Sequence, residues 1–159
     1  MIPKKILYCT DFSKNSRTAG NYAVEYAKVF EAALMVLHVI ESWEGFPTSQ
    51  DRLKADIDRL IRSSEKLANA ELKEWSDQVI QGVERVSTHV RMGIPAREIV
   101  LLANEQAVGL IVMGTRGRTG LKHILLGSVA ENVIKTAQSP VLVVRSVLTT
   151  SKVVEKTQN

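Results

Sequence analysis

The chain has 159 residues, of which 45% are hydrophobic and 24% are charged. This length suits one ordinary domain, because two would average only about 80 residues each, and the composition argues against a disordered or low-complexity chain. The net charge is +4, from 21 Lys and Arg against 17 Asp and Glu, which is too mild to indicate a nucleic-acid-binding protein.

The compartment expected from the sequence is the cytoplasm. Apolar runs such as residues 32–37 and 109–113 are too short to cross a bilayer, and no signal-peptide pattern opens the chain. Cys9 is the single cysteine, which excludes an internal disulfide and a multi-cysteine metal site.

The first half of the chain alternates short β runs with amphipathic helices. Residues 5–9 predict a strand, and Ser13 is the expected N-cap of a helix whose apolar positions run from 19 to 30. Residues 33–40 predict a second strand, and residues 41–50 a loop. A long helix follows and ends near Gly82, with one expected apolar stripe through Leu53, Ile57, Leu60, Ile61, Leu67, Leu72, Trp75 and Val79.

The second half continues the alternation. Residues 85–91 predict a half-exposed strand near a sheet edge, and Pro95 begins a short helix through residues 99–103. Residues 110–113 predict an apolar strand near the sheet centre, and a helix through residues 129–137 precedes the last strand at residues 141–145. We expect one domain over residues 1–146 and a polar tail over residues 147–159.

Five strands that alternate with four helices predict an α/β fold, an open parallel sheet with helices on both faces. In such sheets ligands bind beyond the carboxyl ends of the strands, where the strand order reverses. The best-equipped ends follow the first strand, at Thr10 and Asp11, and the fourth, from Gly114 onward. These two ends would meet in the strand order 3-2-1-4-5.

The most informative stretch is rich in glycine. Gly114, Gly117 and Gly120 follow a strand at a spacing of three, which lets backbone N–H groups approach an anion. Gly127 and Ser128 then open a helix, whose N-terminus favours a phosphate. Arg116, Arg118 and Lys122 would add positive charge, so a di- or triphosphate is the candidate ligand.

Each of these features also fits a simpler role. The glycines could only form a turn, Ser128 and Glu131 match a capping box, and the basic residues suit a solvated loop. Asp11 could hold ribose hydroxyls or cap the following helix. No nucleophile, base and orienting group assemble in the sequence, so we expect no catalytic residues.

Over residues 4–145 the chain resembles the universal stress protein family. Its pattern G-x-x-G-x9-G-[ST] is matched by Gly114, Gly117, Gly127 and Ser128. Residues 6–13 are similar to the family's first strand and T/V-D-x-S turn, and residues 37–39 resemble its second-strand ending. Residues 93–99 resemble its G-x-P-x-x-x-I turn, and residues 139–144 its closing strand.

The resemblance implies the ATP-binding branch and an adenine nucleotide alpha hydrolase-like fold. It would place the ribose on Asp11, the adenine on the backbone of Val39 and the phosphates on residues 117 and 127–129. The nucleotide-binding residues expected are Thr10, Asp11, Val39, Met113, Gly114, Arg116, Gly117, Gly127, Ser128 and Val129. Ala130 departs from the family, since many binding members carry a second hydroxyl there, and this leaves AMP as an alternative to ATP.

The resemblance also implies a homodimer through antiparallel pairing of the last strands, and a Mg²⁺ ion, if present, held through the phosphates. The expected function is a dimeric stress-response protein that binds an adenine nucleotide and signals through its bound form, without being an enzyme. Two alternatives stay open at this point: slow ATP hydrolysis or autophosphorylation on Ser128 or Thr119, and an interaction protein that binds no nucleotide.

Overall fold

A five-stranded parallel sheet organises the chain, as expected, in the order β3-β2-β1-β4-β5. The computed structural model describes residues 2–42, 51–115 and 126–145. The strands are β1 (Lys5–Cys9), β2 (Ala33–Glu41), β3 (Val86–Gly93), β4 (Leu110–Gly114) and β5 (Val141–Val144). The helices are α1 (Lys14–Val29), α2 (Asp51–Val79), α3 (Pro95–Glu105) and α4 (Ser128–Thr136).

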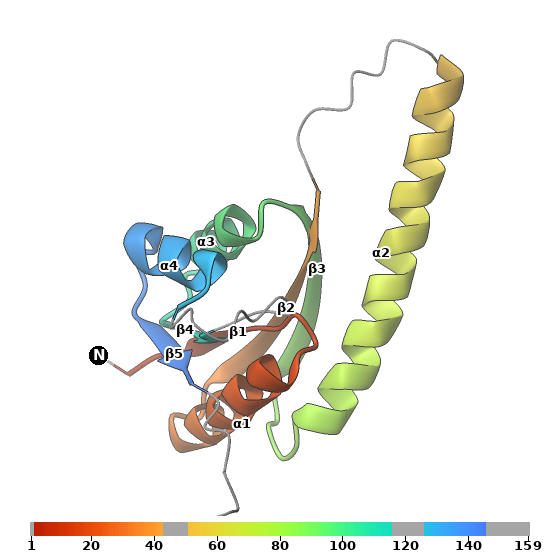
Figure 1. Ribbon diagram of the computed structural model, residues 1–159. Helices are drawn as coiled ribbons and strands as arrows, with labels where there is room; N and C mark the ends of the chain where they lie inside the picture. Colours follow the sequence, from red (N-terminus) through yellow and green to blue (C-terminus); the bar gives the residue numbers. More distant parts are fainter. Residues whose placement is uncertain (1, 43–50, 116–125, 146–159) are drawn as a thin grey trace, which may run out of the picture.

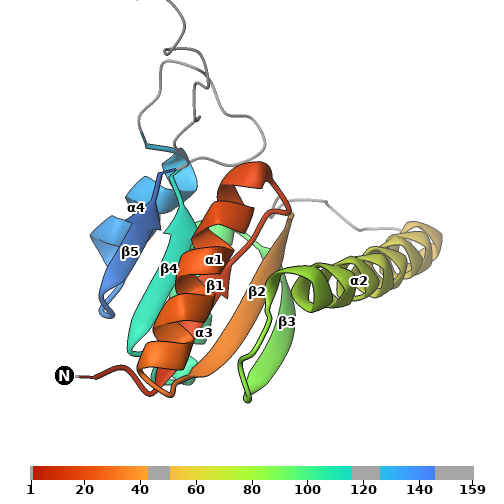
Figure 2. The same ribbon diagram turned by 90° about the horizontal axis from the view of Figure 1, so that it is seen from below.

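The helices cover both faces of the sheet. Helices α1 and α2 lie on one face, and α3 and α4 on the other (Figures 1 and 2). Because successive side chains of a strand point to opposite faces, β1 sends Ile6 and Tyr8 to the first face and Leu7 to the second. Each face thus has its own core, and the two cores share the strands between them.

The start of α1 follows the predicted local chemistry. Ser13 is the N-cap, and its hydroxyl oxygen accepts a hydrogen bond from the backbone N–H of Ser16 at 3.2 Å. The expected edge position of β3 is also confirmed, since it pairs with β2 alone in the described sheet. Its first residue, Val86, is 40% exposed.

The single apolar stripe expected along α2 is wrong. Leu72 and Val79 are buried, but Leu60 and Leu67 are 67% and 72% exposed. A helix of 29 residues is about 43 Å long, whereas the nine residues of β2 extend about 30 Å. The amino-terminal part of α2, which carries Leu60, therefore extends past the sheet (Figure 1). Leu67 is exposed for another reason: its neighbour Ala68 is buried at the same level of the helix, so Leu67 lies on the side that faces away from the sheet.

The polar tail expected at residues 147–159 lies outside the described residues, and so does the loop expected at residues 41–50 from residue 43 on. Within the described ranges, no helix combines the length and the apolar character that a bilayer crossing needs.

Candidate functional site

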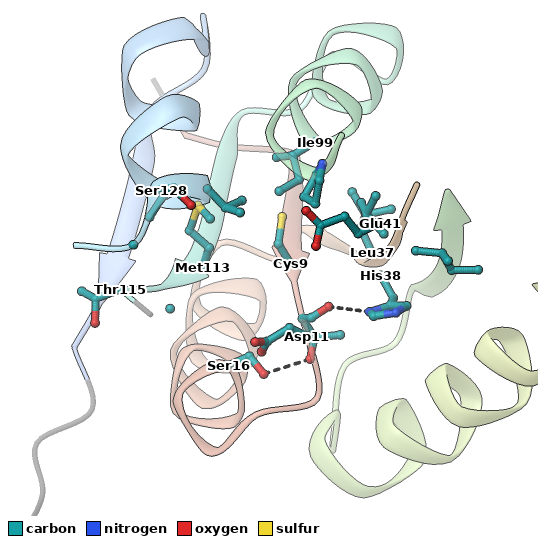
Figure 3. Close-up of a pocket in the computed structure, with 18 residues that line it drawn as sticks. Cys9, Asp11, Ser16, Leu37, His38, Glu41, Ile99, Met113, Thr115 and Ser128 are labelled. Atoms are coloured by element: carbon teal, nitrogen blue, oxygen red, sulfur yellow. Dashed lines mark hydrogen bonds between the residues drawn. The ribbon is translucent and has the colours of Figure 1, made fainter. Parts of the chain in front are cut away.

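A cavity of about 600 Å³ opens at the carboxyl ends of β1, β2 and β4 (Figure 3). The neighbouring strands β1 and β4 are followed by helices on opposite faces of the sheet, α1 on one and α4 on the other, so the connections diverge at this place. This divergence is the position at which open α/β sheets bind their ligands, and the volume suits a small organic molecule.

The structure brings eight of the ten residues that the sequence predicts to bind a nucleotide to one cavity. The cavity wall includes Thr10, Asp11, Val39, Met113, Gly114, Gly127, Ser128 and Val129. The other two, Arg116 and Gly117, lie outside the described residues, as do Arg118, Lys122 and Thr119. Ala130, where the sequence departs from the family pattern, also lines the cavity.

Asp11 sits on the turn between β1 and α1. One oxygen of its carboxylate, Oδ1, accepts a hydrogen bond from the backbone N–H of Ser13 at 3.1 Å, and the side chain lines the cavity. The alternative role foreseen for Asp11, capping the following helix, is wrong, because Ser13 is the N-cap of α1 and the Asp11 carboxylate instead holds the turn before it.

Val39 offers its backbone to the cavity. Ala33 N–H donates to the Lys4 carbonyl, and the Leu37 carbonyl accepts from Thr10 N–H. The backbone N–H and C=O groups of the odd-numbered residues of β2 therefore point toward β1. Val39 continues this series, but β1 has already ended at Cys9. The Val39 N–H and C=O therefore face the space that β1 has left, one donor beside one acceptor.

The N-terminus of α4 forms the opposite side of the cavity. Gly127 is the N-cap, with no side-chain capping bond, and Ser128 is the first helical residue. The capping box expected between Ser128 and Glu131 is therefore wrong. Glu131 instead pairs with Lys135, whose Nζ lies 2.6 Å from the Glu131 Oε1 and holds the pKa of that carboxyl below its usual range. The Ser128 side chain lines the cavity rather than capping its own helix.

Gly114 lets the end of β4 approach the first turn of α1. A Cβ atom at this position would lie 3.3 Å from the backbone carbonyl carbon and oxygen of Asn15. This glycine therefore has a packing reason that does not depend on a ligand, in addition to its place in the cavity wall.

Several cavity residues were missed or were given another role from the sequence. His38, Cys9, Glu41, Ile99 and Thr115 all line the cavity, although none of them is among the binding residues expected from the sequence (Figure 3). For Cys9, His38, Glu41 and Thr115 the signal that could have found them is a position at or near the carboxyl end of a strand, which places a residue at this edge whatever its type. Ile99 lies on α3 and reaches the cavity through the packing of that helix against the sheet.

The cavity combines an apolar wall with a polar end. Val39, Ile40, Ile99 and Met113 contribute the apolar wall, while the polar end is the α4 N-terminus, which carries a partial positive charge. Burial raises the pKa of the Cys9 thiol, so it stays protonated in the wall. In the described ranges, no group of three metal-binding side chains assembles. The arrangement suits a ligand with a flat apolar part and an anionic part.

Comparison with known proteins gives the same family from sequence and from structure. The model of the universal stress protein family matches residues 3–145. Universal stress protein MJ0531 of Methanocaldococcus jannaschii is 39% identical over 150 residues, covering 89% of this chain and 82% of that protein. Universal stress protein MJ0577 of the same organism is 37% identical over 153 residues, covering 89% and 94%.

Solved structures agree with these matches. The structure of MJ0577 aligns with a TM-score of 0.74 at 33% identity, covering 92% of this chain and 98% of that one. A universal stress protein solved in complex with cAMP aligns with a TM-score of 0.58 at 26% identity, covering 91% and 98%. The chain described here belongs to the universal stress protein family.

Proposed function

We propose that this protein binds an adenine nucleotide, ATP or AMP, in the cavity at the carboxyl ends of β1, β2 and β4, and that it acts as a binding and signalling module in a stress response. The observation that carries the proposal is that three groups, each suited to one part of a nucleotide, line the same cavity. These are the Asp11 carboxylate, the backbone of Val39 and the N-terminus of α4 at Ser128.

Each group fits one part of a nucleotide. The Val39 N–H and C=O match the acceptor and donor on the edge of adenine, and a carboxylate such as Asp11 accepts hydrogen bonds from ribose hydroxyls. The N–H groups at the start of α4 and the Ser128 hydroxyl suit phosphate oxygens. The related protein solved with cAMP, an adenine nucleotide, supports the same ligand class. A Mg²⁺ ion, if bound, would be held through the phosphates.

Calorimetric titration with ATP tests the proposal. We expect Asp11→Asn to weaken ATP binding about tenfold, and Ser128→Ala about threefold to tenfold, through loss of hydrogen bonds to the ligand. Asp77→Asn on the exposed face of α2 and Ser87→Ala on β3 are matched controls and should bind like the wild type. Absence of ATP and AMP binding by the wild type would refute the proposal, as would equal affinities in all five proteins.

The same titration addresses the choice of nucleotide. Ala130 is buried in the cavity wall at the first turn of α4. Its methyl side chain offers no hydroxyl to a phosphate. We expect Ala130→Ser to raise the affinity for ATP relative to AMP, because a new hydroxyl adds a donor beside the phosphates. An unchanged ratio of the ATP and AMP affinities would show that the side chain at position 130 does not contact the phosphates.

The proposal assigns binding to the site and not catalysis. Incubation with γ-labelled ATP should therefore release no phosphate above the rate in buffer and should leave no label on the protein. Label on Ser128, detected by mass spectrometry, or phosphate release that disappears in Asp11→Asn, would favour the enzymatic alternative instead.

We further propose that two copies pair through β5. This strand is an edge of the described sheet, and its apolar residues Val141 to Val144 are at most half-exposed. An open apolar edge is a template for a further strand, and antiparallel pairing of two β5 strands would close it in both copies.

A further inference from the structure

Asp11 is held on a turn of unusual backbone conformation. The next residue, Phe12, has a φ of 63°, in the left-handed region that bulky side chains rarely adopt. This value sets the direction in which the chain leaves β1 for α1, and with it the place of the Asp11 carboxylate. Contacts from the surrounding structure must therefore maintain this conformation.

Two side chains from other elements hold Phe12. Its ring stacks on the ring of His38, with centroids 4.2 Å apart and planes at 30°, and it meets the ring of Trp75 edge-on at 5.6 Å. The Phe12 N–H also donates to the Thr10 hydroxyl oxygen at 3.0 Å. His38 belongs to β2 and Trp75 to α2, so the turn is fixed from two sides.

His38 also holds the backbone on the other side of Asp11. Its Nδ1 lies 2.9 Å from the carbonyl oxygen of Thr10, and because a carbonyl only accepts, Nδ1 carries the proton and donates (Figure 3). The last described backbone bond between this segment and β2 is Thr10 N–H to the Leu37 carbonyl. The His38 ring thus continues the attachment to β2 at the point where the strand ladder stops.

The hydroxyl of Thr10 is fixed in turn. Thr10 is buried, and its Oγ1 lies 3.0 Å from the hydroxyl of Ser16 on α1. The Tyr8 hydroxyl donates to the Ser16 carbonyl at 2.8 Å and accepts from Trp75 Nε1 at 3.1 Å. The residues on both sides of Asp11 are therefore held by β2, α1 and α2 together.

We propose that His38 is a positioning residue for the nucleotide site. It fixes the Thr10 carbonyl by its hydrogen bond and Phe12 by stacking, and so sets where the Asp11 carboxylate meets the ribose. This inference rests on the proposed function for its effect on affinity, but its effect on the turn itself does not depend on a ligand.

Two substitutions separate the hydrogen bond of His38 to Thr10 from its stacking on Phe12. His38→Phe keeps a ring for stacking but removes the donor to Thr10, whereas His38→Asn keeps a donor close to the position of Nδ1 and removes the ring. We expect His38→Phe to weaken ATP binding about tenfold, because the buried Thr10 carbonyl loses its partner and the turn shifts. Affinity should be partly restored in His38→Asn, to about threefold below the wild type, because this variant keeps the hydrogen bond and loses only the stacking on Phe12. His89→Phe on β3 is the matched control and should leave ATP affinity unchanged.

A second ligand distinguishes positioning from general damage. Dideoxy-ATP lacks the ribose hydroxyls that Asp11 would contact, so His38→Phe should reduce its affinity much less than that of ATP. In an Asp11→Asn background, His38→Phe should add little to the loss of ATP affinity, because its effect passes through that carboxylate. Equal losses for both nucleotides, or additive losses in the double variant, would overturn the proposal.

Amide hydrogen exchange gives a readout without any nucleotide. The Ser13 N–H is bonded to Asp11 Oδ1 and the Phe12 N–H to Thr10 Oγ1, so both should exchange at least about tenfold faster in His38→Phe. Amides in the middle of α1 should be unchanged. Unchanged exchange at Phe12 and Ser13 would overturn the positioning role. Faster exchange in a protein that binds no nucleotide would instead refute the proposed function and leave the positioning of the turn intact.

Discussion

Among single residues, Cys9 joins the core to the cavity wall. Its side chain is 8% exposed at the end of β1, and burial raises the pKa of the thiol. Since the thiolate is the reactive form, we expect alkylation at pH 8 to be about a hundredfold slower in the folded protein than in urea. Bound ATP should slow the reaction further, because Cys9 lines the site. Mass-spectrometric rates of iodoacetamide labelling would measure both effects, and rapid labelling of the folded protein would contradict them.

His89 on β3 makes stability depend on pH. Partial burial, and then the neighbouring Arg91 charge, lower the pKa of His89 below 6.5. The unfolded chain therefore binds a proton at a higher pH than the folded chain does. This residue's contribution is fully present above pH 6.5 and is lost as the pH falls from there to the folded pKa.

The variant His89→Gln should remove the part of the pH dependence of stability that comes from His89. Melting temperatures of the wild type and the variant, measured between pH 5 and pH 8, should show the wild type losing more stability on acidification. Because His38 and His123 are present in both proteins, the difference between the two curves isolates His89. Parallel curves would show that the pKa of His89 is the same in the folded and unfolded chains.

At the scale of elements, α1 packs closely enough to exclude a methyl group. A Cβ atom at Gly20 would lie 2.7 Å from Val79 Cγ1 on α2 and 2.9 Å from the Tyr8 ring on β1. Alanine favours a helix over glycine by about 1 kcal/mol, but overpacking costs about 1–3 kcal/mol. We expect Gly20→Ala to be destabilising despite its better helix propensity.

Urea denaturation of two variants shows whether the added methyl group stabilises or destabilises the protein. Gly20→Ala should lower the free energy of unfolding, whereas Asn21→Ala, one residue further along the same helix and exposed, should raise it slightly. If both variants are more stable than the wild type, then α1, α2 and β1 can separate without cost, and the close packing would not constrain the fold.

The secondary structure could be predicted from the sequence because its signals are local. The Ser13 N-cap and the apolar run at residues 5–9 depend on neighbouring residues alone, and both elements lie where the pattern placed them. Which part of α2 is buried could not be predicted in this way. Leu60 and Leu72 belong to the same helical pattern, but only the second lies over the sheet, and that depends on the length of β2.

The residues of the site also divide into those that local sequence patterns could predict and those that depend on the tertiary fold. Asp11, Gly127 and Ser128 could be predicted because they carry a recognisable motif at fixed spacing. His38, Cys9 and Glu41 lie at or near strand ends, but they belong to no motif, and which strand ends come together depends on the pairing of the strands in the folded sheet. The capping box at Ser128 failed for a geometric reason: the helix begins one residue too early for the serine to act as N-cap.

For the whole molecule, the proposed β5 pairing can be tested at a single amide. The carbonyls of Pro140 and Val144 accept hydrogen bonds from the N–H groups of Ile111 and Thr115. The backbone N–H and C=O groups of even-numbered residues therefore point toward β4, while those of Val143 point away from the sheet. Val143→Pro removes an outward N–H and leaves the ladder to β4 intact. We expect light scattering at micromolar concentration to show a dimer for the wild type and a monomer for Val143→Pro.

A matched change on the other edge controls for the effect of proline itself. The carbonyls of Arg85, just before β3, and of Gly93, at its end, accept bonds from Leu34 and Ser42, so the backbone groups of odd-numbered residues face β2 and Thr88 directs its N–H outward. Thr88→Pro should leave the dimer unchanged. A monomeric wild type would refute the pairing, and a dimer that persists in Val143→Pro would place the interface elsewhere.

The cavity occupies one end of the sheet, and the opposite end carries four tight returns at residues 30–32, 80–85, 106–109 and 137–140. A peptide tag or a fluorophore grafted into one of these returns would stand a full strand length away from any nucleotide. The molecule could thus be tethered to a sensor surface by that end, with its mouth open to the solution. Because the cavity and these returns lie at opposite ends of the sheet, a reporter for the ligand proposed here could be attached without touching the binding end.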